Sequence, residues 1–174
     1  MSLSVLLAAA AAAGSPQWIP SSPDLGVAEG RCRPNESGPA FMISIDGLKD
    51  RQGMMRVELY PNNDDDFLAD DNVLIMAGKA FRRAEAKVPA SGPVTLCIRA
   101  PSAGTYTLSL MHDRDSNRKL GLSVDGVAFP GDPRLCWGQP KASEARATTG
   151  NGPTKIDVTM QYRRSLVCFG PLKK

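Results

Sequence analysis

Catalytic motifs are missing from this sequence, and histidine is nearly so. The chain has one histidine, His112, and no G-x-S-x-G nucleophile elbow, P-loop or G-x-G-x-x-G dinucleotide motif. A single histidine excludes a metal site built from several histidines, and no motif identifies the serine that a hydrolytic triad would need. Because an enzyme of this size usually brings together several polar groups, we expect a protein without catalytic activity.

A strong charge imbalance is also lacking. The 21 lysines and arginines nearly balance the 18 aspartates and glutamates, so the formal net charge is +3. The basic residues are scattered in short pairs such as Arg82–Arg83 and Arg163–Arg164, and they form no stripe. Proteins that bind nucleic acid usually present such a stripe. We therefore expect no nucleic-acid partner.

The apolar run at the N-terminus, Leu3–Ala13, is too short to cross a bilayer, which takes about 20 residues. It matches the core of a secretory signal, with small residues for cleavage near Ala11–Ala13. No lysine or arginine precedes it, so the terminal amine supplies the positive charge there. We expect residues 1–14 to be a signal segment and the protein to be periplasmic or secreted, without a transmembrane segment. The alternative is an alanine-rich tail.

Closely spaced cysteines are absent. The four cysteines stand far apart in the chain, at Cys32, Cys97, Cys136 and Cys168. Zinc sites usually bring two ligands close in sequence, so this even set favours two disulfide bonds in an oxidising compartment. Of the three possible pairings we favour Cys32–Cys97 with Cys136–Cys168, because the first would fix the N-terminal segment and the second the C-terminal one. The alternative is buried, unpaired cysteine.

Glycine and proline, by contrast, are abundant, and they separate short segments in which apolar and polar residues alternate as in β-strands. The expected strands are 41–46, 55–60, 94–99, 105–111, 120–124 and 156–162, with 73–77 and 79–88 as further candidates. The first two are expected to form a hairpin. Since no long helical pattern is present, we predict an all-β sandwich of about seven strands over residues 41–174, after an extended lead-in over residues 15–40.

A long irregular loop is expected before the last strand, over Gly126–Pro153. Loops of this length in a compact domain are usually functional or internally tied down. Cys136 offers such a tie. The apolar residues Phe129, Leu135 and Trp137 are expected to pack the loop onto the sandwich.

Five aspartates lie in the segment Pro61–Asn72, PNNDDDFLADDN, around Phe67 and Leu68. We interpret this segment as a solvated loop that the two apolar residues anchor to the core. The alternative is a cation site, although adjacent aspartates repel one another and rarely all face one ion. A short helix over Asp70–Ala77 is an alternative to the strand over 73–77.

The segment Gly104–Gly126 joins two expected strands through a turn rich in Asp and Asn. Oxygen ligands stand at alternate positions, as at the start of a calcium-binding loop, and a further carboxylate follows late in the turn: Asp113, Asp115, Asn117 and Asp125. Arg118 stands where such loops usually have glycine. Calcium binding is therefore one interpretation. The other, which we favour, is that the Asp, Ser and Asn side chains over residues 113–117 cap their own backbone in a β-turn.

His112 beside Asp113 suggests acid–base catalysis, in which a carboxylate orients an imidazole. Adjacent residues on a strand point to opposite faces, however, so the two side chains would not meet if the strand continues. We expect a hydrogen-bonded structural histidine rather than a hydrolase or isomerase that uses His112.

The pattern Gly104-x-Tyr106, followed by His112-Asp113-x-Asp115-x-Asn117-x-Lys119, resembles a family of small exported bacterial proteins, domain of unknown function twenty-one forty-one. The likeness extends more loosely over Phe41–Tyr162. It implies an immunoglobulin-like or transthyretin-like β-sandwich and export. It implies no reaction, because the activity of that family is unknown.

These features together favour a non-enzymatic exported module that requires no cofactor. We expect it to bind a protein or an envelope component through the polar turn and the loop Gly126–Pro153, because loops on a rigid sandwich commonly carry binding function. The alternatives are a calcium-stabilised structural module and a small hydrolase or isomerase based on His112.

Overall fold

The computed structural model describes residues 18–172, so the expected signal segment lies outside the described residues. Strands in this range are β1 (Ala40–Asp46), β2 (Met54–Pro61), β3 (Arg82–Lys87), β4 (Val94–Arg99), β5 (Gly104–Asp113), β6 (Gly126–Ala128), β7 (Leu135–Cys136), β8 (Arg146–Thr149), β9 (Pro153–Thr159), β10 (Gln161–Arg163) and β11 (Cys168–Pro171). Helical elements are α1 (Val27–Gly30), α2 (Asp71–Met76) and the 3-10 turn η1 (Ala142–Glu144). The prediction of an all-β chain is confirmed.

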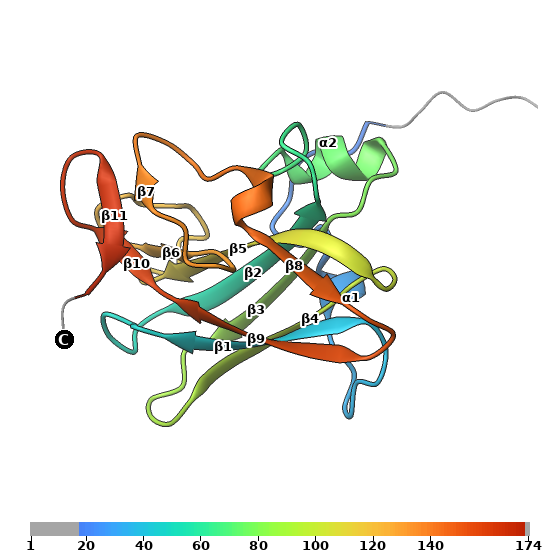
Figure 1. The fold of residues 1–174 in the computed structure, drawn as a ribbon, viewed down its shortest axis with the longest axis horizontal. Coiled ribbons are helices and arrows are strands. Elements are labelled where there is room, and N and C mark those ends of the chain that lie inside the picture. The colour runs from blue at the N-terminus through green and yellow to red at the C-terminus, as the bar shows by residue number, and fades with distance from the viewer. Residues whose placement is uncertain (1–17, 173–174) are drawn as a thin grey trace, which may run out of the picture.

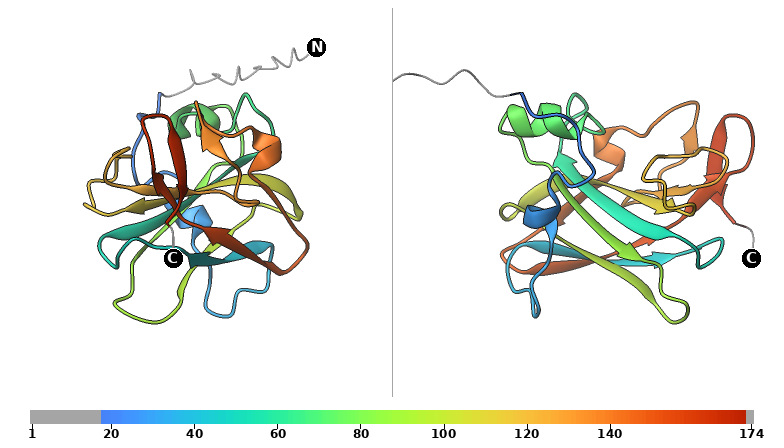
Figure 2. Two further views of the ribbon diagram at one scale, coloured as in Figure 1. Left: turned by 60° about the vertical axis from the view of Figure 1, so that its left-hand side comes forward. Right: turned by 180° about the vertical axis from the view of Figure 1, so that it is seen from behind.

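Two β-sheets pack face to face as a sandwich (Figure 1). The smaller sheet has the order β4–β1–β9, in which β1 pairs antiparallel with β4 and parallel with β9. The larger sheet has the order β3–β2–β5–β6–β10–β11–β7, and β8 pairs with the start of β5. Figure 2 shows the same two layers from another side and from behind. The predicted sandwich is confirmed, with more and shorter strands than expected.

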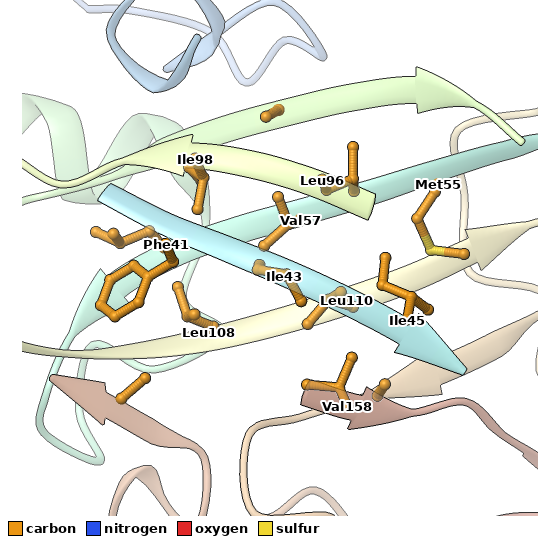
Figure 3. Close-up of a cluster of buried hydrophobic side chains, with 14 of the residues drawn as sticks. Phe41, Ile43, Ile45, Met55, Val57, Leu96, Ile98, Leu108, Leu110 and Val158 are labelled. Carbon is orange, nitrogen blue, oxygen red and sulfur yellow. The ribbon is translucent and has the colours of Figure 1, made fainter. Parts of the chain in front are cut away.

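The alternation in the sequence turns one face of each strand into the core between the sheets. Phe41, Ile43 and Ile45 of β1 are buried, whereas the residues between them point away from the core. Figure 3 shows them against side chains of the larger sheet, among them Met55, Val57, Leu108 and Leu110. Burying one such side chain contributes roughly 1.5–3 kcal/mol, so this cluster is the main source of stability.

A second apolar cluster anchors the acidic segment before α2. Phe67 is buried, and its ring meets those of Tyr60 and Phe129 edge to face. Leu68 packs beside the same cluster. The anchoring of this segment by two apolar residues is therefore confirmed, but its solvation is only partial, because Asp66 and Asp71 are buried. The helix α2 begins at the end of this segment with Leu74 buried, so the candidate strand over 73–77 is wrong and the alternative, a short helix, is confirmed.

The expected hairpin between residues 41–46 and 55–60 is wrong. Strand β1 pairs with β4 and β9, whereas β2 pairs with β3 and β5 in the other sheet. Alternation indicates which face of a strand is buried, but it does not identify the neighbouring strand. The connection over residues 47–53 crosses between the sheets. It ends at Gly53, where φ is 75° and a Cβ would lie 2.0 Å from the Asp113 carbonyl oxygen.

The expected strand over residues 120–124 is also wrong. The chain forms a turn there, in which the backbone N–H groups of Val124 and Asp125 donate to the Gly121 carbonyl. The Asp125 carboxylate accepts the Gly121 N–H, so groups that a β-ladder would need are used locally. Leu120 and Leu122 stay exposed, and β6 pairs with β5 instead.

The segment 126–153 is less irregular than expected. It contains β6 and β8, which both pair with β5, and β7, which pairs with β11. Phe129 and Leu135 pack onto the second cluster as expected, but Trp137 projects into solvent. The expected closing strand is divided at Met160 into β9 in the smaller sheet and β10 in the larger sheet.

Both disulfide bonds have the pairing that the sequence favours. Cys32–Cys97 ties the lead-in to β4, with a Cα–Cα distance of 5.9 Å. Cys136–Cys168 joins β7 to β11. Such bonds persist in oxidising compartments, which fits a non-cytoplasmic protein. Within residues 18–172, no helix has the length and apolar character needed to cross a membrane.

Candidate functional site

Two buried carboxylates organise the polar turn between β5 and β6. Asp113, at the end of β5, accepts hydrogen bonds from the backbone N–H groups of Asn117 and Arg118 at 3.2 and 2.8 Å. Asp125, just before β6, accepts two further backbone hydrogen bonds from the turn, at 2.9 and 2.7 Å. The turn is therefore closed by the side chains at its two ends, as expected for capping residues.

Three of the four predicted calcium ligands lie together. Asp113, Asp115 and Asp125 each contribute a carboxylate oxygen to a group whose atoms all lie within 4.8 Å of one another. The fourth, Asn117, donates its side-chain amide to Asp115 at 2.8 Å. Burial raises the pKa of Asp113, and the neighbouring carboxylates of Asp115 and Asp125 add to this effect. Calcium binding here stays the alternative interpretation.

The aspartates of the acidic segment Pro61–Asn72 do not gather in this way. Asp66 pairs with Lys79, with 2.5 Å between Nζ and Oδ1. Asp71 pairs with Arg83 at 3.3 Å. Asp64 accepts a backbone hydrogen bond from η1 at 2.7 Å. Each of these carboxylates has its own partner, which does not support the alternative of a shared cation site.

His112 lies on β5 with both ring nitrogens in hydrogen bonds. Nε2 lies 2.8 Å from the Gln52 carbonyl oxygen, which can only accept, so Nε2 carries the proton. Nδ1 therefore accepts the hydroxyl proton of Tyr162 at 2.6 Å. The same hydroxyl accepts the Lys49 N–H at 2.9 Å. His112 is thus a hydrogen-bonded histidine, as expected, and Asp113 is not its partner.

The electrostatics of this pair favour the neutral forms. Burial lowers the pKa of His112 below its ordinary value of 6.5, against the opposing effects of the Gln52 carbonyl and the Asp50 carboxylate. Burial also raises the pKa of Tyr162 to about 12. None of the His112 surface reaches solvent. A substrate therefore cannot contact the ring in this conformation.

An ion pair lies beside His112, and neither of its residues is among the predicted site residues. Arg114 pairs with Asp50 and donates a hydrogen bond to the Val124 carbonyl at 2.9 Å. Hydrogen bonding to Arg114 lowers the pKa of Asp50. The pair joins the connection between β1 and β2 to the polar turn. Its partners stand 64 residues apart in the chain, so local sequence patterns carry no signal for it.

An apolar groove lies beside β6, β7 and β11. It has a volume of about 470 Å³ and is lined by the end of the polar turn, by the segment 126–153 and by the hairpin of β10 and β11. We call it the apolar groove, and its exposed large apolar side chains are Leu120, Leu122, Trp137, Leu166 and Val167. Among the described residues, no charged residue lines the apolar groove.

The second disulfide shapes this groove. Cys136 stands opposite Cys168 in the pairing of β7 with β11, and the Trp137 N–H donates to the Val167 carbonyl at 2.9 Å. Trp137 has a φ of 66°, a conformation that is uncommon outside glycine. This backbone arrangement directs the side chain outward, with 84% of its surface exposed.

The sequence pattern indicates part of the groove and misses the rest. The polar turn and the segment 126–153, in which binding is expected, both contribute to it. Alternation assigns Leu120 and Leu122 to a strand, and Leu166 belongs to a tail without an assigned role. One sequence signal for the exposed residues of the groove was available: Leu120, Leu122 and Leu166 stand beside glycine, serine or basic residues.

Comparisons with known proteins identify a family but no individual relative. A search of curated proteins and a search of solved structures each gave no match. The sequence model of one family, described as an uncharacterized protein conserved in bacteria (DUF2141), matches residues 43–157. The match runs from β1 to β9 and includes the polar turn and His112, whereas β10 and β11 lie beyond it. The resemblance drawn from the motif is confirmed: the chain belongs to the DUF2141 family of uncharacterized proteins conserved in bacteria.

Proposed function

We propose that the protein is a non-enzymatic, exported β-sandwich module that binds a protein or another component of the bacterial envelope through the apolar groove. The observation that carries this proposal is the exposure of large apolar side chains in one groove. Leu122, Trp137 and Leu166 expose 55%, 84% and 86% of their surfaces. A contiguous exposed apolar surface on a rigid scaffold is typical of an interaction site.

Trp137 is suited to be the anchor of such a contact. Its ring offers roughly 150–250 Å² of surface to bury, and tryptophan is enriched among the residues that dominate binding energies. The backbone on which it stands is held by the hydrogen bond to Val167 and by the adjacent disulfide of Cys136. A held backbone reduces the entropy that is lost on binding.

Two further features support the remaining parts of the proposal. The paired disulfides favour an oxidising compartment, in agreement with the signal segment expected over residues 1–14. The single histidine is enclosed and neutral, which favours a structural role over acid–base chemistry. Export to the periplasm or the medium would place the groove among envelope components.

The proposal predicts that the folded protein co-sediments with washed bacterial envelopes through the groove. Trp137→Ser combined with Leu166→Ser is expected to reduce the bound fraction by about tenfold or more, because two large apolar side chains leave the contact. Trp18→Ser is the matched control, since Trp18 is 67% exposed but does not line the groove. Equal sedimentation of the wild type and the double variant would contradict the proposal.

A calcium-stabilised structural module is the alternative function, supported by the gathered carboxylates of Asp113, Asp115 and Asp125. A ligand that binds only the folded state raises the Tm. Each of these carboxylate oxygens already accepts a hydrogen bond within the turn, so we expect the same Tm in EDTA and in millimolar calcium.

A thermal melt separates the two functions. A calcium-dependent rise in Tm that Asp115→Asn removes would assign the polar turn to ion binding. Asp157→Asn serves as the control, because Asp157 is exposed on β9 and lies outside the carboxylate group.

A further inference from the structure

We propose that the partner of the apolar groove is the anionic lipid surface of a membrane, with the exposed apolar side chains entering the interfacial region and a basic rim facing the head groups. This inference names the partner of the proposed function and rests on it. It is carried by the position of the groove, by the charge around it and by the chemistry of its exposed side chains.

The groove occupies one end of the molecule. Figures 1 and 2 place β7 and β11 at the end of the sandwich that is remote from α2. Leu122, Trp137 and Leu166 belong to three separate segments, and each brings an apolar side chain to this end. An end from which several apolar side chains project can touch a flat surface without a complementary pocket on the other side.

The rim of the groove is basic. Charged residues that adjoin a lining residue in the chain are all positive: Lys119, Arg134 and Lys141. Arg164 stands two residues before the lining residue Leu166. All four basic side chains are exposed, and none forms an ion pair within the described part of the chain. Each basic residue near an anionic membrane contributes about fivefold to partitioning.

Of the acidic residues near the groove in the chain, Asp125, Asp132 and Glu144 accept hydrogen bonds from the protein, and Asp125 alone is buried. Asp125 is buried and accepts backbone hydrogen bonds in the polar turn. Asp132 accepts hydrogen bonds from the N–H and the hydroxyl of Thr159 at 2.8 and 2.9 Å. Glu144 accepts the Lys141 N–H at 2.9 Å. These hydrogen bonds leave Asp132 and Glu144 charged and exposed, but the four exposed basic side chains at the rim outnumber these two carboxylates.

Lipid fits these features better than the other occupants. In a symmetric contact between two copies of the chain, the same basic rim would face itself, and like charges across an interface disfavour binding. A protein partner would need an apolar ridge and an acidic border of matching shape. An anionic membrane offers both negative charge and apolar material without such a match, and tryptophan favours the membrane interface.

Trp137 can report on the contact directly. The chain has two tryptophans, so Trp18→Phe leaves Trp137 as the sole one. We expect its emission to shift to the blue when the oxidised variant is mixed with vesicles that contain phosphatidylglycerol, and to stay unchanged with vesicles of phosphatidylcholine alone. Trp137→Phe, in which Trp18 is the reporter, should show no shift with either.

Charge variants test the role of the rim. Lys119→Ala combined with Arg164→Ala is expected to weaken partitioning into phosphatidylglycerol vesicles by roughly 25-fold, from two contributions of about fivefold each. Lys155→Ala is the control, because Lys155 is exposed on β9 in the smaller sheet. Added salt should weaken binding of the wild type in the same direction, since it screens the rim from the lipid charge.

The outcomes separate this inference from the proposed function. Groove-dependent sedimentation with whole envelopes, without any response to phosphatidylglycerol vesicles, overturns the lipid inference and leaves a protein partner. If neither the groove-dependent sedimentation nor the response to phosphatidylglycerol vesicles is found, the lipid inference and the proposed function are both overturned. A Trp137 shift that grows with protein concentration and needs no vesicles identifies a second copy as the occupant and also overturns the inference. Vesicle binding that the Lys119 and Arg164 changes do not weaken overturns the role given to the rim.

Discussion

Replacing Cys32 and Cys97 together by serine is expected to lower the free energy of unfolding by roughly 4 kcal/mol. The bond links residues separated by 65 positions, so its loss frees a long loop in the unfolded chain. It also releases the lead-in, which is held elsewhere by a bridge between Arg31 and Ile98 and by a hydrogen bond from Arg82 to the Glu29 carbonyl at 3.0 Å. Urea denaturation under oxidising conditions measures the change.

The matched variant for this test is the double serine replacement of Cys136 and Cys168. Their separation is 32 positions, so the entropic loss is slightly smaller. This second variant should weaken envelope binding as well, because the bond shapes the apolar groove, whereas the first should leave binding by the folded protein intact. A loss below about 1 kcal/mol in the Cys32 and Cys97 variant would show that the lead-in is held without its disulfide.

His112→Ala is expected to cost roughly 3–5 kcal/mol of stability. The change leaves a cavity in place of a fully buried ring. It also removes the acceptor of the Tyr162 hydroxyl proton and the donor to the Gln52 carbonyl. Denaturant unfolding at neutral pH measures the loss. His112→Asn, which can form one of these hydrogen bonds, should lose less. A stability equal to that of the wild type would contradict the structural role of His112.

The same residue predicts how stability depends on pH. The pKa of His112 in the folded protein lies below the ordinary 6.5, so the unfolded chain binds the proton first as the pH falls. Stability is therefore complete above about pH 6.5 and declines below it, by at most about 1.4 kcal/mol per pH unit. His112→Asn should remove this decline. Carboxylates with lowered pKa values, such as Asp50, reduce stability only when the pH falls to about their ordinary pKa of 3.8.

The sequence predicts best the features that depend on local periodicity. Phe41, Ile43 and Ile45 alternate with polar residues, and that pattern alone places them in a half-buried strand. The sandwich and the capping role of Asp113 follow from similar local signals. The capping role of Asp125 does not, because its partner Arg114 stands 11 residues away. The disulfide pairing follows from the need to fix both ends of the chain.

The features that were missed depend on contacts between distant segments. Alternation over residues 120–124 suggests a strand, but the Asp125 carboxylate binds the backbone there and holds it in a turn. Nothing local shows that β1 and β2 belong to different sheets. The apolar groove likewise arises only when the disulfide brings Trp137 beside Leu166 at the end of the polar turn.

The bound fraction of the Trp137→Ser, Leu166→Ser variant on washed bacterial envelopes, relative to Trp18→Ser, tests the central claim most directly. All proteins are compared as oxidised monomers with matching urea midpoints, so that a folding defect is not scored as lost binding. The claim that the apolar groove is the interaction surface predicts that the groove variant retains about a tenth or less of the binding shown by the Trp18 control. Equal binding by the two variants would contradict it.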